Sequence, residues 1–230
     1  MLLALSWGAS PEDFLELDAS YQRRHEAVVL ESALERGNAL LLKEPDNYDL
    51  LWRLARLEVW IAAQMDESGS KKRGARRAWE LGDRARRLRP ERAEGHYYAA
   101  LGVGLWGEAG GIAASFFSGV ATKFLERLNL AAALDPDLDR GGPLLAQARF
   151  KMVIPWPFRN MDQAKRLLEK VSREHPQNLR AKWYLHQLYQ GRGDSLPARR
   201  LLSEIQASDE SYDPAEARAI KVLALKAIHH

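Results

Sequence analysis

The chain has 230 residues, of which 46% are hydrophobic and 28% charged, and its formal net charge is +3. A chain of this length and composition can bury a substantial core, which excludes disorder as its main state. It contains no cysteine, so disulfides, thiolate metal sites and cysteine nucleophiles are excluded. No run approaches the roughly 20 apolar residues that a membrane-spanning helix needs.

The first residues, MLLALSWGASPEDF, combine a short apolar run with small residues. Two interpretations stay open: the stub of an export signal, or a hydrophobic first turn that packs on the body. Ser10, Pro11 and the acids that follow them predict the start of a helix, because serine caps free backbone amides and proline suits the first turn.

Helical periodicity continues along the chain. Apolar positions recur at helical spacing over 21–43 and again over 46–66, and the basic segment 75–90 is a further predicted helix. The polar stretch 66–74 is predicted to be a loop. No segment alternates for long enough with the period of two that a strand requires. The sequence therefore predicts an all-α protein.

Four predicted helices end at prolines and resemble one another, which indicates an internal repeat. The prolines are Pro45, Pro90, Pro136 and Pro176. Twelve residues before them stand Ala33, Ala78, Phe124 and Ala164, and eight residues before them stand Gly37, Gly82, Leu128 and Leu168. Small residues suit a close crossing of two helices, and proline fits only where a helix has ended. This pattern resembles the tetratricopeptide repeat.

The repeat predicts the architecture. We expect an all-α superhelical stack of about four or five tetratricopeptide-like hairpins, with extra terminal helices. The whole chain, 1–230, is expected to be a single helical-repeat domain. Within it we expect an N-terminal extension over 1–20, repeats over 21–210 and a capping helix over 211–230, opened by Asp213 and Pro214.

The stretch from 90 to 136 is rich in glycine, alanine and aromatic residues. Its segment from Gly102 to Gly107 matches the GxGxxG pattern of dinucleotide-binding loops. That pattern binds phosphate only where a strand leads into a helix, whereas the preceding residues here are predicted to be helical. Close helix packing is the better interpretation. If Gly104, Gly107 and Gly111 contact other helices, the stretch serves helix packing. If they border empty space, the stretch forms a gate to a cavity.

Two further patterns suggest metal binding but are incomplete. Asp135, Asp137 and Asp139 alternate as in a calcium loop, yet Arg140 stands where that loop needs glycine. The His-Glu pair at 25–26 lacks the second histidine of a zinc-binding helix. We therefore predict no catalytic residue, no cofactor and no metal site, and the chain is not expected to be an enzyme.

The segment 71–92 holds ten Lys and Arg against three acids. On a helix these cations fall mostly opposite the stripe of Ala78, Gly82 and Ala85, which is typical of a solvated face. Nucleic acid is a disfavoured partner for this face, and an acidic protein is a better one.

Aromatic and polar side chains supply the candidate binding residues. The repeat register assigns them to a concave face: Trp52, Arg56, Tyr97, Tyr98, Trp106, Trp183, Gln187 and Gln190. First helices of stacked hairpins line such a surface, where rings offer apolar area and polar groups orient a ligand. The alternative is that the rings are packing between helices. Trp156, Phe158 and Arg159 lie in a proline-rich loop and are candidates for a surface contact.

A more specific resemblance covers residues 45–205. The segments LWRLARLEVW, GHYYAALGVGLWGEAGGI, LDPDLDRGGPLLAQARF and VIPWPFRNMDQAKRLLEKV occur in this order. This succession is similar to the T-component family of tripartite ATP-independent periplasmic (TRAP) transporters. The resemblance implies a non-enzymatic, periplasmic protein that docks a solute-binding protein and holds a hydrophobic or amphipathic small ligand.

The alternative function is a general tetratricopeptide scaffold that binds a peptide segment or an acidic protein partner. Such a scaffold could reside in the periplasm or in the cytoplasm. A homo-oligomer is compatible with both functions.

Overall fold

The computed structural model describes residues 8–117 and 119–228, so the interpretations placed on residues 1–7 lie outside the described residues. The described part of the chain forms twelve helices and no strand, which confirms the predicted all-α class. Contacts within the chain group it into two compact units, Met1–Leu134 and Asp135–His230. Each unit is described by itself.

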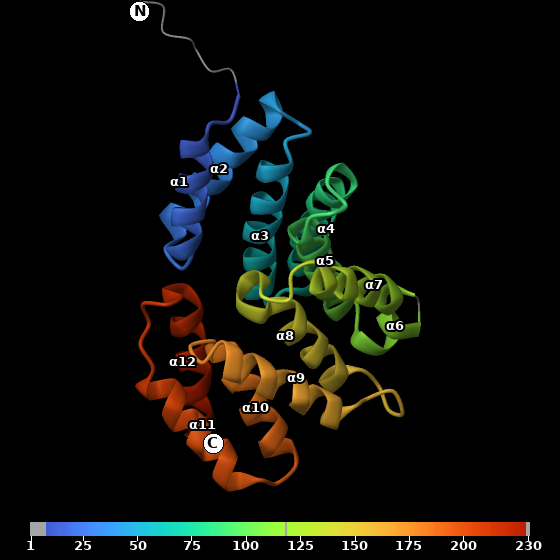
Figure 1. The fold of residues 1–230 in the computed structure, drawn as a ribbon, viewed down its shortest axis with the longest axis vertical. Helices are drawn as coiled ribbons and strands as arrows, with labels where there is room; N and C mark the ends of the chain where they lie inside the picture. The colour runs from blue at the N-terminus through green and yellow to red at the C-terminus, as the bar shows by residue number, and fades with distance from the viewer. Residues whose placement is uncertain (1–7, 118, 229–230) are drawn as a thin grey trace, which may run out of the picture. The chain divides into compact units, whose positions relative to one another are not determined.

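The first unit is built from helical hairpins. Its helices are α1 (Pro11–Gln22), α2 (Ala27–Lys43), α3 (Tyr48–Gln64), α4 (Ser68–Leu88), α5 (Ala93–Ala109), α6 (Ile112–Phe117) and α7 (Val120–Leu134). Helices α3, α4 and α5 pack side by side at its centre (Figure 1). Helix α1 contacts both α2 and α3, so the described part of the segment predicted as an N-terminal extension contributes to the first hairpin.

Burial confirms the repeat register. The residues twelve before each proline, Ala33, Ala78, Phe124 and Ala164, are all buried. The residues eight before, Gly37, Gly82, Leu128 and Leu168, are buried as well. Each proline stands two residues after a helix end, at the ends of α2, α4, α7 and α9.

Glycines permit the close crossing of α4 and α5. A Cβ atom added at Gly82 would lie 2.5 Å from the backbone nitrogen of Ala99, and one added at Gly102 would lie 2.4 Å from the backbone nitrogen of Trp79. Real Cβ atoms do not approach backbone so closely, so the two helices need glycine at both positions. The GxGxxG pattern therefore lies inside a packed helix and serves the contact between α4 and α5.

The glycine-rich part of α5 packs closely against α7. A Cβ atom at Gly104 would lie 2.9 Å from the ring of Phe124. Helix α5 continues to Ala109, and the turn after it begins at Gly110. Gly111 adopts a φ of +96° with nothing within 4 Å of its Cβ position, as expected for a surface turn.

The prediction of a loop over 66–74 was wrong, because α4 already begins at Ser68. The side chain of Glu67 caps this end by accepting hydrogen bonds from the backbone amides of Gly69 (2.7 Å) and Ser70 (2.6 Å). The hydroxyl of Ser68 also donates to the carbonyl of Ala109 at the end of α5, at 2.7 Å. A cap and a tertiary contact thus override the low helix propensity of this polar stretch.

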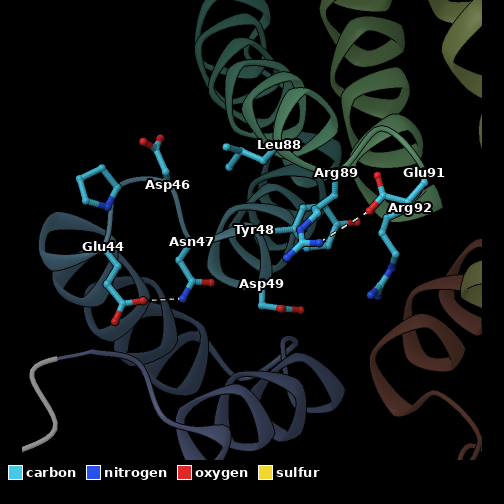
Figure 2. Close-up of a pocket in the computed structure, with 10 residues that line it drawn as sticks. Glu44, Asp46, Asn47, Tyr48, Asp49, Leu88, Arg89, Glu91 and Arg92 are labelled. Carbon is cyan, nitrogen blue, oxygen red and sulfur yellow. Dashed lines mark hydrogen bonds and ion pairs between the residues drawn. The ribbon is translucent and has the colours of Figure 1, made fainter.

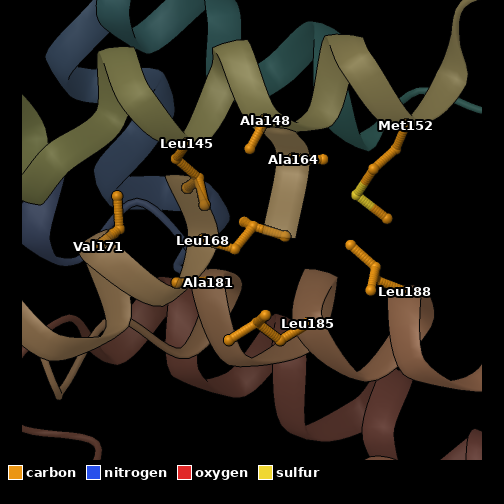
Figure 3. Close-up of a cluster of buried hydrophobic side chains, with 9 residues drawn as sticks. All are labelled: Leu145, Ala148, Met152, Ala164, Leu168, Val171, Ala181, Leu185 and Leu188. Carbon is orange, nitrogen blue, oxygen red and sulfur yellow. The ribbon is translucent and has the colours of Figure 1, made fainter. Parts of the chain in front are cut away.

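The second unit contains α8 (Leu138–Val153), α9 (Met161–Glu174), α10 (Leu179–Gly191), α11 (Ser195–Ala207) and α12 (Pro214–Ile228). Its first three helices share a core of small and large apolar side chains (Figure 3). These are Leu145, Ala148, Met152, Ala164, Leu168, Val171, Ala181, Leu185 and Leu188. Helices α10, α11 and α12 share a second core, in which α12 packs against both α10 and α11.

The start of α8 is kinked at Asp139, Arg140 and Gly141, which have φ values of 50°, 62° and 80°. Non-glycine residues rarely adopt positive φ, so Arg140 needs outside support. Its guanidinium provides that support by bonding the carboxylate of Asp213 at 2.7 Å and the carbonyl of Tyr212 at 2.8 Å.

Candidate binding face of the first unit

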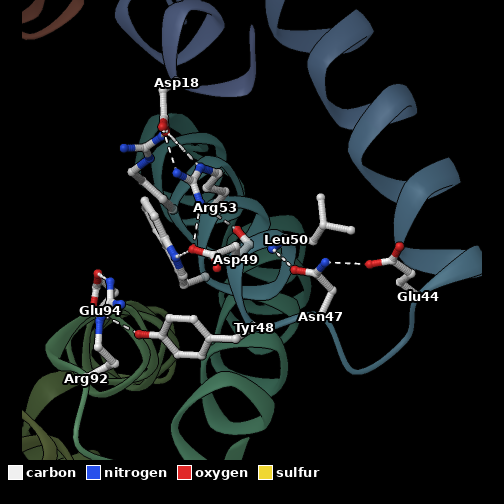
Figure 4. Close-up of polar contacts among 11 residues, drawn as sticks. Asp18, Glu44, Asn47, Tyr48, Asp49, Leu50, Arg53, Arg92 and Glu94 are labelled. Carbon is white, nitrogen blue, oxygen red and sulfur yellow. Dashed lines mark hydrogen bonds and ion pairs between the residues drawn. The ribbon is translucent and has the colours of Figure 1, made fainter. Parts of the chain in front are cut away.

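The candidate binding face of the first unit begins at the start of α3. The side-chain oxygen of Asn47 accepts a hydrogen bond from the backbone amide of Leu50 at 3.1 Å and so caps the helix. The Asn47 amide donates to Glu44 at 2.6 Å, and Glu44 accepts a further bond from the backbone of Ala9 at 2.8 Å. Figure 4 shows the contacts that run from Glu44 through Asn47 to Leu50 in the first turn of α3. The loop between α2 and α3 is thereby fixed in place.

A tyrosine and an ion pair join the starts of α3 and α5. The hydroxyl of Tyr48 donates to Glu94 at 2.9 Å, and Arg92 pairs with the same carboxylate at 2.5 Å (Figure 4). Burial raises the pKa of Tyr48, and the neighbouring Glu94 charge raises it further. Burial also pushes the pKa of Glu94 upward, but the hydrogen bonds from Arg92 and Tyr48 outweigh it and leave that pKa below its usual value. The carboxylate is therefore ionised at neutral pH.

One aspartate of α1 holds two arginines of α3. Asp18 accepts hydrogen bonds from Arg53 at 2.9 Å and from Arg56 at 2.5 Å. Arg53 also bonds Asp49 at 3.0 Å, and its guanidinium carbon lies 4.2 Å from the centroid of the Trp52 ring. Cations over aromatic faces are stabilised by the ring quadrupole. These contacts fasten α1 to α3.

The second arginine completes a stack of rings. The guanidinium of Arg56 lies 4.0 Å from the Tyr21 ring and 5.0 Å from the Trp52 ring. Trp52 also stacks on Tyr98 of α5, with centroids 6.1 Å apart and planes 7° apart. The stack runs from α1 through α3 to α5. Its members touch one another and leave little ring area for a ligand.

The predicted strip is therefore filled with protein contacts in the first unit. Trp52, Tyr97 and Tyr98 are all buried, and Arg56 is mostly buried. This placement favours the alternative that the rings are packing between helices. Trp106 lies apart from the stack: its ring meets Trp79 of α4 edge-on at 6.2 Å. The binding role of these residues stays a prediction.

The remaining strip residues belong to the second unit. Trp183 packs against the core of α10, α11 and α12 and stacks on His186 at 5.1 Å. His186 itself is buried and makes a 3.0 Å contact with the carbonyl of Ala198, where the two helices of the hairpin meet. Gln187 is half-buried and Gln190 is exposed. Trp183 is thus another ring engaged in packing.

The proline-rich loop between α8 and α9 is a surface feature. Trp156 and Phe158 are both exposed, and Arg159 is exposed with its Nε donating to the carbonyl of Ile154 at 3.2 Å. This position agrees with a surface contact, and the partner of the loop stays a prediction.

An open pocket of about 810 Å³ lies beside the start of α3 (Figure 2). It is formed by the loop between α2 and α3 and the loop between α4 and α5. Its lining residues are Glu44, Pro45, Asp46, Asn47, Tyr48, Asp49, Leu88, Arg89, Glu91 and Arg92. The sequence interpretation missed this pocket, although a signal for it was present. Each of the two loops contains a repeat proline, so both occupy equivalent places in neighbouring hairpins, and stacking brings them together.

The outer face of α4 adjoins the pocket and is strongly basic. Arg76 and Arg87 have side chains more than half exposed, and they lie opposite the buried small residues of this helix. Arg89, which directly follows the helix, is also more than half exposed. The prediction of a solvated basic face is confirmed. Pocket and basic face together offer charged groups of both signs, which suits binding of a polar protein surface.

The fold and these surfaces define a helical-repeat protein with a stack of antiparallel hairpins. The family model of Regulator of microtubule dynamics protein 1-3 matches residues 15–140, which is more than half of the chain. The chain belongs to this family. No curated protein matches the chain in sequence.

The family match overturns the resemblance to the TRAP T-component. Docking of a periplasmic solute-binding protein is not supported, and the periplasmic expectation drawn from that resemblance conflicts with the match as well. The general peptide scaffold gains no specific support. The likeness was misleading because glycine, alanine and aromatic positions serve helix packing in many hairpin repeats. Between residues 8 and 228, position 118 excepted, no helix has the length and apolarity to cross a membrane.

Proposed function

We propose that this protein regulates microtubule dynamics by binding the polymer, without catalysis. The observation that carries the proposal is the family match over residues 15–140. These bounds run from the first turns of α1 to the start of α8 and nearly coincide with the first compact unit. The first unit is therefore the part that we expect to act.

The outer face of α4 is the surface that we expect to contact the polymer. Its exposed arginines are held on a helix whose opposite side is locked against α5, so they form a rigid array of positive charge. Charged surfaces steer the association of two molecules, and this electrostatic attraction weakens as salt is added. A contact made by this face should favour an acidic region of the polymer.

Co-sedimentation with stabilised microtubules tests the binding. We expect the chain to pellet with the polymer in low salt, and the bound fraction to fall as salt is added. The variant carrying Arg76→Glu and Arg87→Glu should bind at least several-fold more weakly. The matched control carries Arg173→Glu and Arg199→Glu in the second unit, at two exposed cations, and should bind as the unmodified chain does.

Growth and shrinkage of single microtubules test the regulation. We expect rates or switching frequencies to change in proportion to the amount of chain bound, and the α4 variant to lose this effect. Unchanged dynamics at concentrations that saturate the polymer would refute the proposed function. Equal binding by the α4 variant and the control would refute the assigned surface.

A further inference from the structure

The exposed side of α2 carries two acids bordered by large apolar residues. Val28, Glu31, Glu35 and Leu42 are spaced at i, i+3, i+7 and i+14, so they share one side of the helix. Val28 is 79% exposed and Leu42 84% exposed. Among the described residues, neither Glu31 nor Glu35 has an ion-pair partner. We call these four residues the acidic stripe.

The exposed side of α12 has the opposite charge. Arg218, Val222 and Leu225 recur at i, i+4 and i+7, and Lys226 follows Val222 by one helical turn. Val222 is 53% exposed and Leu225 51% exposed. Arg218 makes only a long contact of 3.7 Å with Glu210, and Lys226 has no ion-pair partner within the described chain. These four residues form the basic stripe.

The exposed apolar residues of α12 are unusual for the terminal helix of a repeat stack. The outer faces of terminal repeats are normally polar, because no neighbour covers them. Helix α12 instead has apolar residues on both sides: Ile220 and Ala224 are buried in the second unit, while Val222 and Leu225 are exposed. Apolar residues on both sides of a helix indicate that both sides are covered.

We propose that copies of this chain associate head to tail, with the acidic stripe of α2 in one copy against the basic stripe of α12 in the next. The charges are complementary between the stripes, and the apolar residues beside them are removed from water in the contact. A symmetric contact of either stripe with itself would oppose like charges, which disfavours it. A contact between two different surfaces leaves one of each free, so it builds rings or open chains.

Sedimentation equilibrium of the unmodified chain is the first test. We expect the mean mass to rise above the 26.0 kDa of one chain between about 10 µM and about 1 mM, the range in which weak contacts become populated. Added salt should lower the mean mass, because screening weakens pairs between exposed charges. A monomer mass at every concentration in low salt would overturn the proposal.

Charge exchange tests the pairing itself. The variant with Glu31→Lys and Glu35→Lys should stay monomeric, and so should the variant with Arg218→Glu and Lys226→Glu. One chain that carries all four substitutions restores complementarity and should associate again. A mixture of the two monomeric variants should also associate, because each supplies the stripe that the other lacks.

A control separates these effects from a general change in charge. Glu80→Lys with Glu126→Lys reverses two exposed acids of α4 and α7 and changes the net charge as much as Glu31→Lys with Glu35→Lys does. This variant should associate as the unmodified chain does. Circular dichroism of every variant should show unchanged helix content. Association that survives either reversal alone, or that is not restored by combining them, would overturn the head-to-tail pairing. No microtubule enters these measurements, so their outcome is independent of the proposed function.

Discussion

Replacement of Trp52 by alanine tests whether the aromatic strip is core or groove. Trp52 is 9% exposed, and its ring is in contact with the Tyr98 ring and with the guanidiniums of two arginines. Its indole nitrogen donates to Asp49 at 3.2 Å. Truncation would remove these contacts together and leave a cavity between α3 and α5.

The expected cost follows from this enclosure. Truncation of a buried tryptophan or phenylalanine to alanine costs about 3–5 kcal/mol, because the lost transfer free energy and the cavity add. A lost hydrogen bond and weakened cation–π contacts keep the cost in the upper part of that range. The melting temperature should fall by on the order of 10 °C.

Chemical denaturation of the full chain measures this cost, and Trp156→Ala is its matched control. Trp156 is 85% exposed, so its removal should change the free energy of unfolding by no more than about 0.5 kcal/mol. If Trp52→Ala cost as little as the control, the ring would not be part of the core. That result would refute the packing argument and restore the groove interpretation.

Two further predictions concern helix crossing and pH. Gly102→Ala should lower the free energy of unfolding by about 1–3 kcal/mol, because the added Cβ would meet the backbone of Trp79. Gly191 has open space around it, so Gly191→Ala should be neutral or slightly stabilising in the same denaturation assay. Equal effects would contradict the close crossing. Glu94 has a pKa below its usual 4.5, so its contribution to stability is present above that value and is lost as the pH falls through the lowered pKa. In Glu94→Gln the free energy of unfolding should therefore decline less steeply below about pH 4.5, and an unchanged acid slope would show that the contact with Arg92 stabilises nothing.

Most of the fold could be predicted from local signals in the sequence. Helical periodicity, capping residues and the four repeat prolines act within one helix or one hairpin, so they can be recognised without knowing where other helices lie. The small residues at Ala78 and Gly82 were rightly assigned to a helix crossing. The segment 66–74 was assigned to a loop because its polar composition gave no apolar face, and only the cap and the contact with α5 made it helical.

The candidate site depended on contacts between distant segments. Whether Trp52 faces a groove or a core could not be settled by spacing, because both arrangements place it on the same side of α3. The answer came from Asp18 of α1, which holds two arginines over the rings. The pocket likewise exists only because loops 43 residues apart, around Asp46 and Arg89, meet at one end of stacked hairpins.

The sequence by itself determined that the protein is all-α, that its hairpins repeat, and which face of each second helix is buried. These properties follow from periodicity and backbone constraints that are encoded over a few turns. The tertiary structure decided which rings are enclosed, which loops form the pocket, and which charged stripes remain uncovered on α2 and α12. Local periodicity indicates which side of a helix faces its own hairpin, but exposure of the other side depends on neighbours from distant segments, which only the tertiary structure supplies.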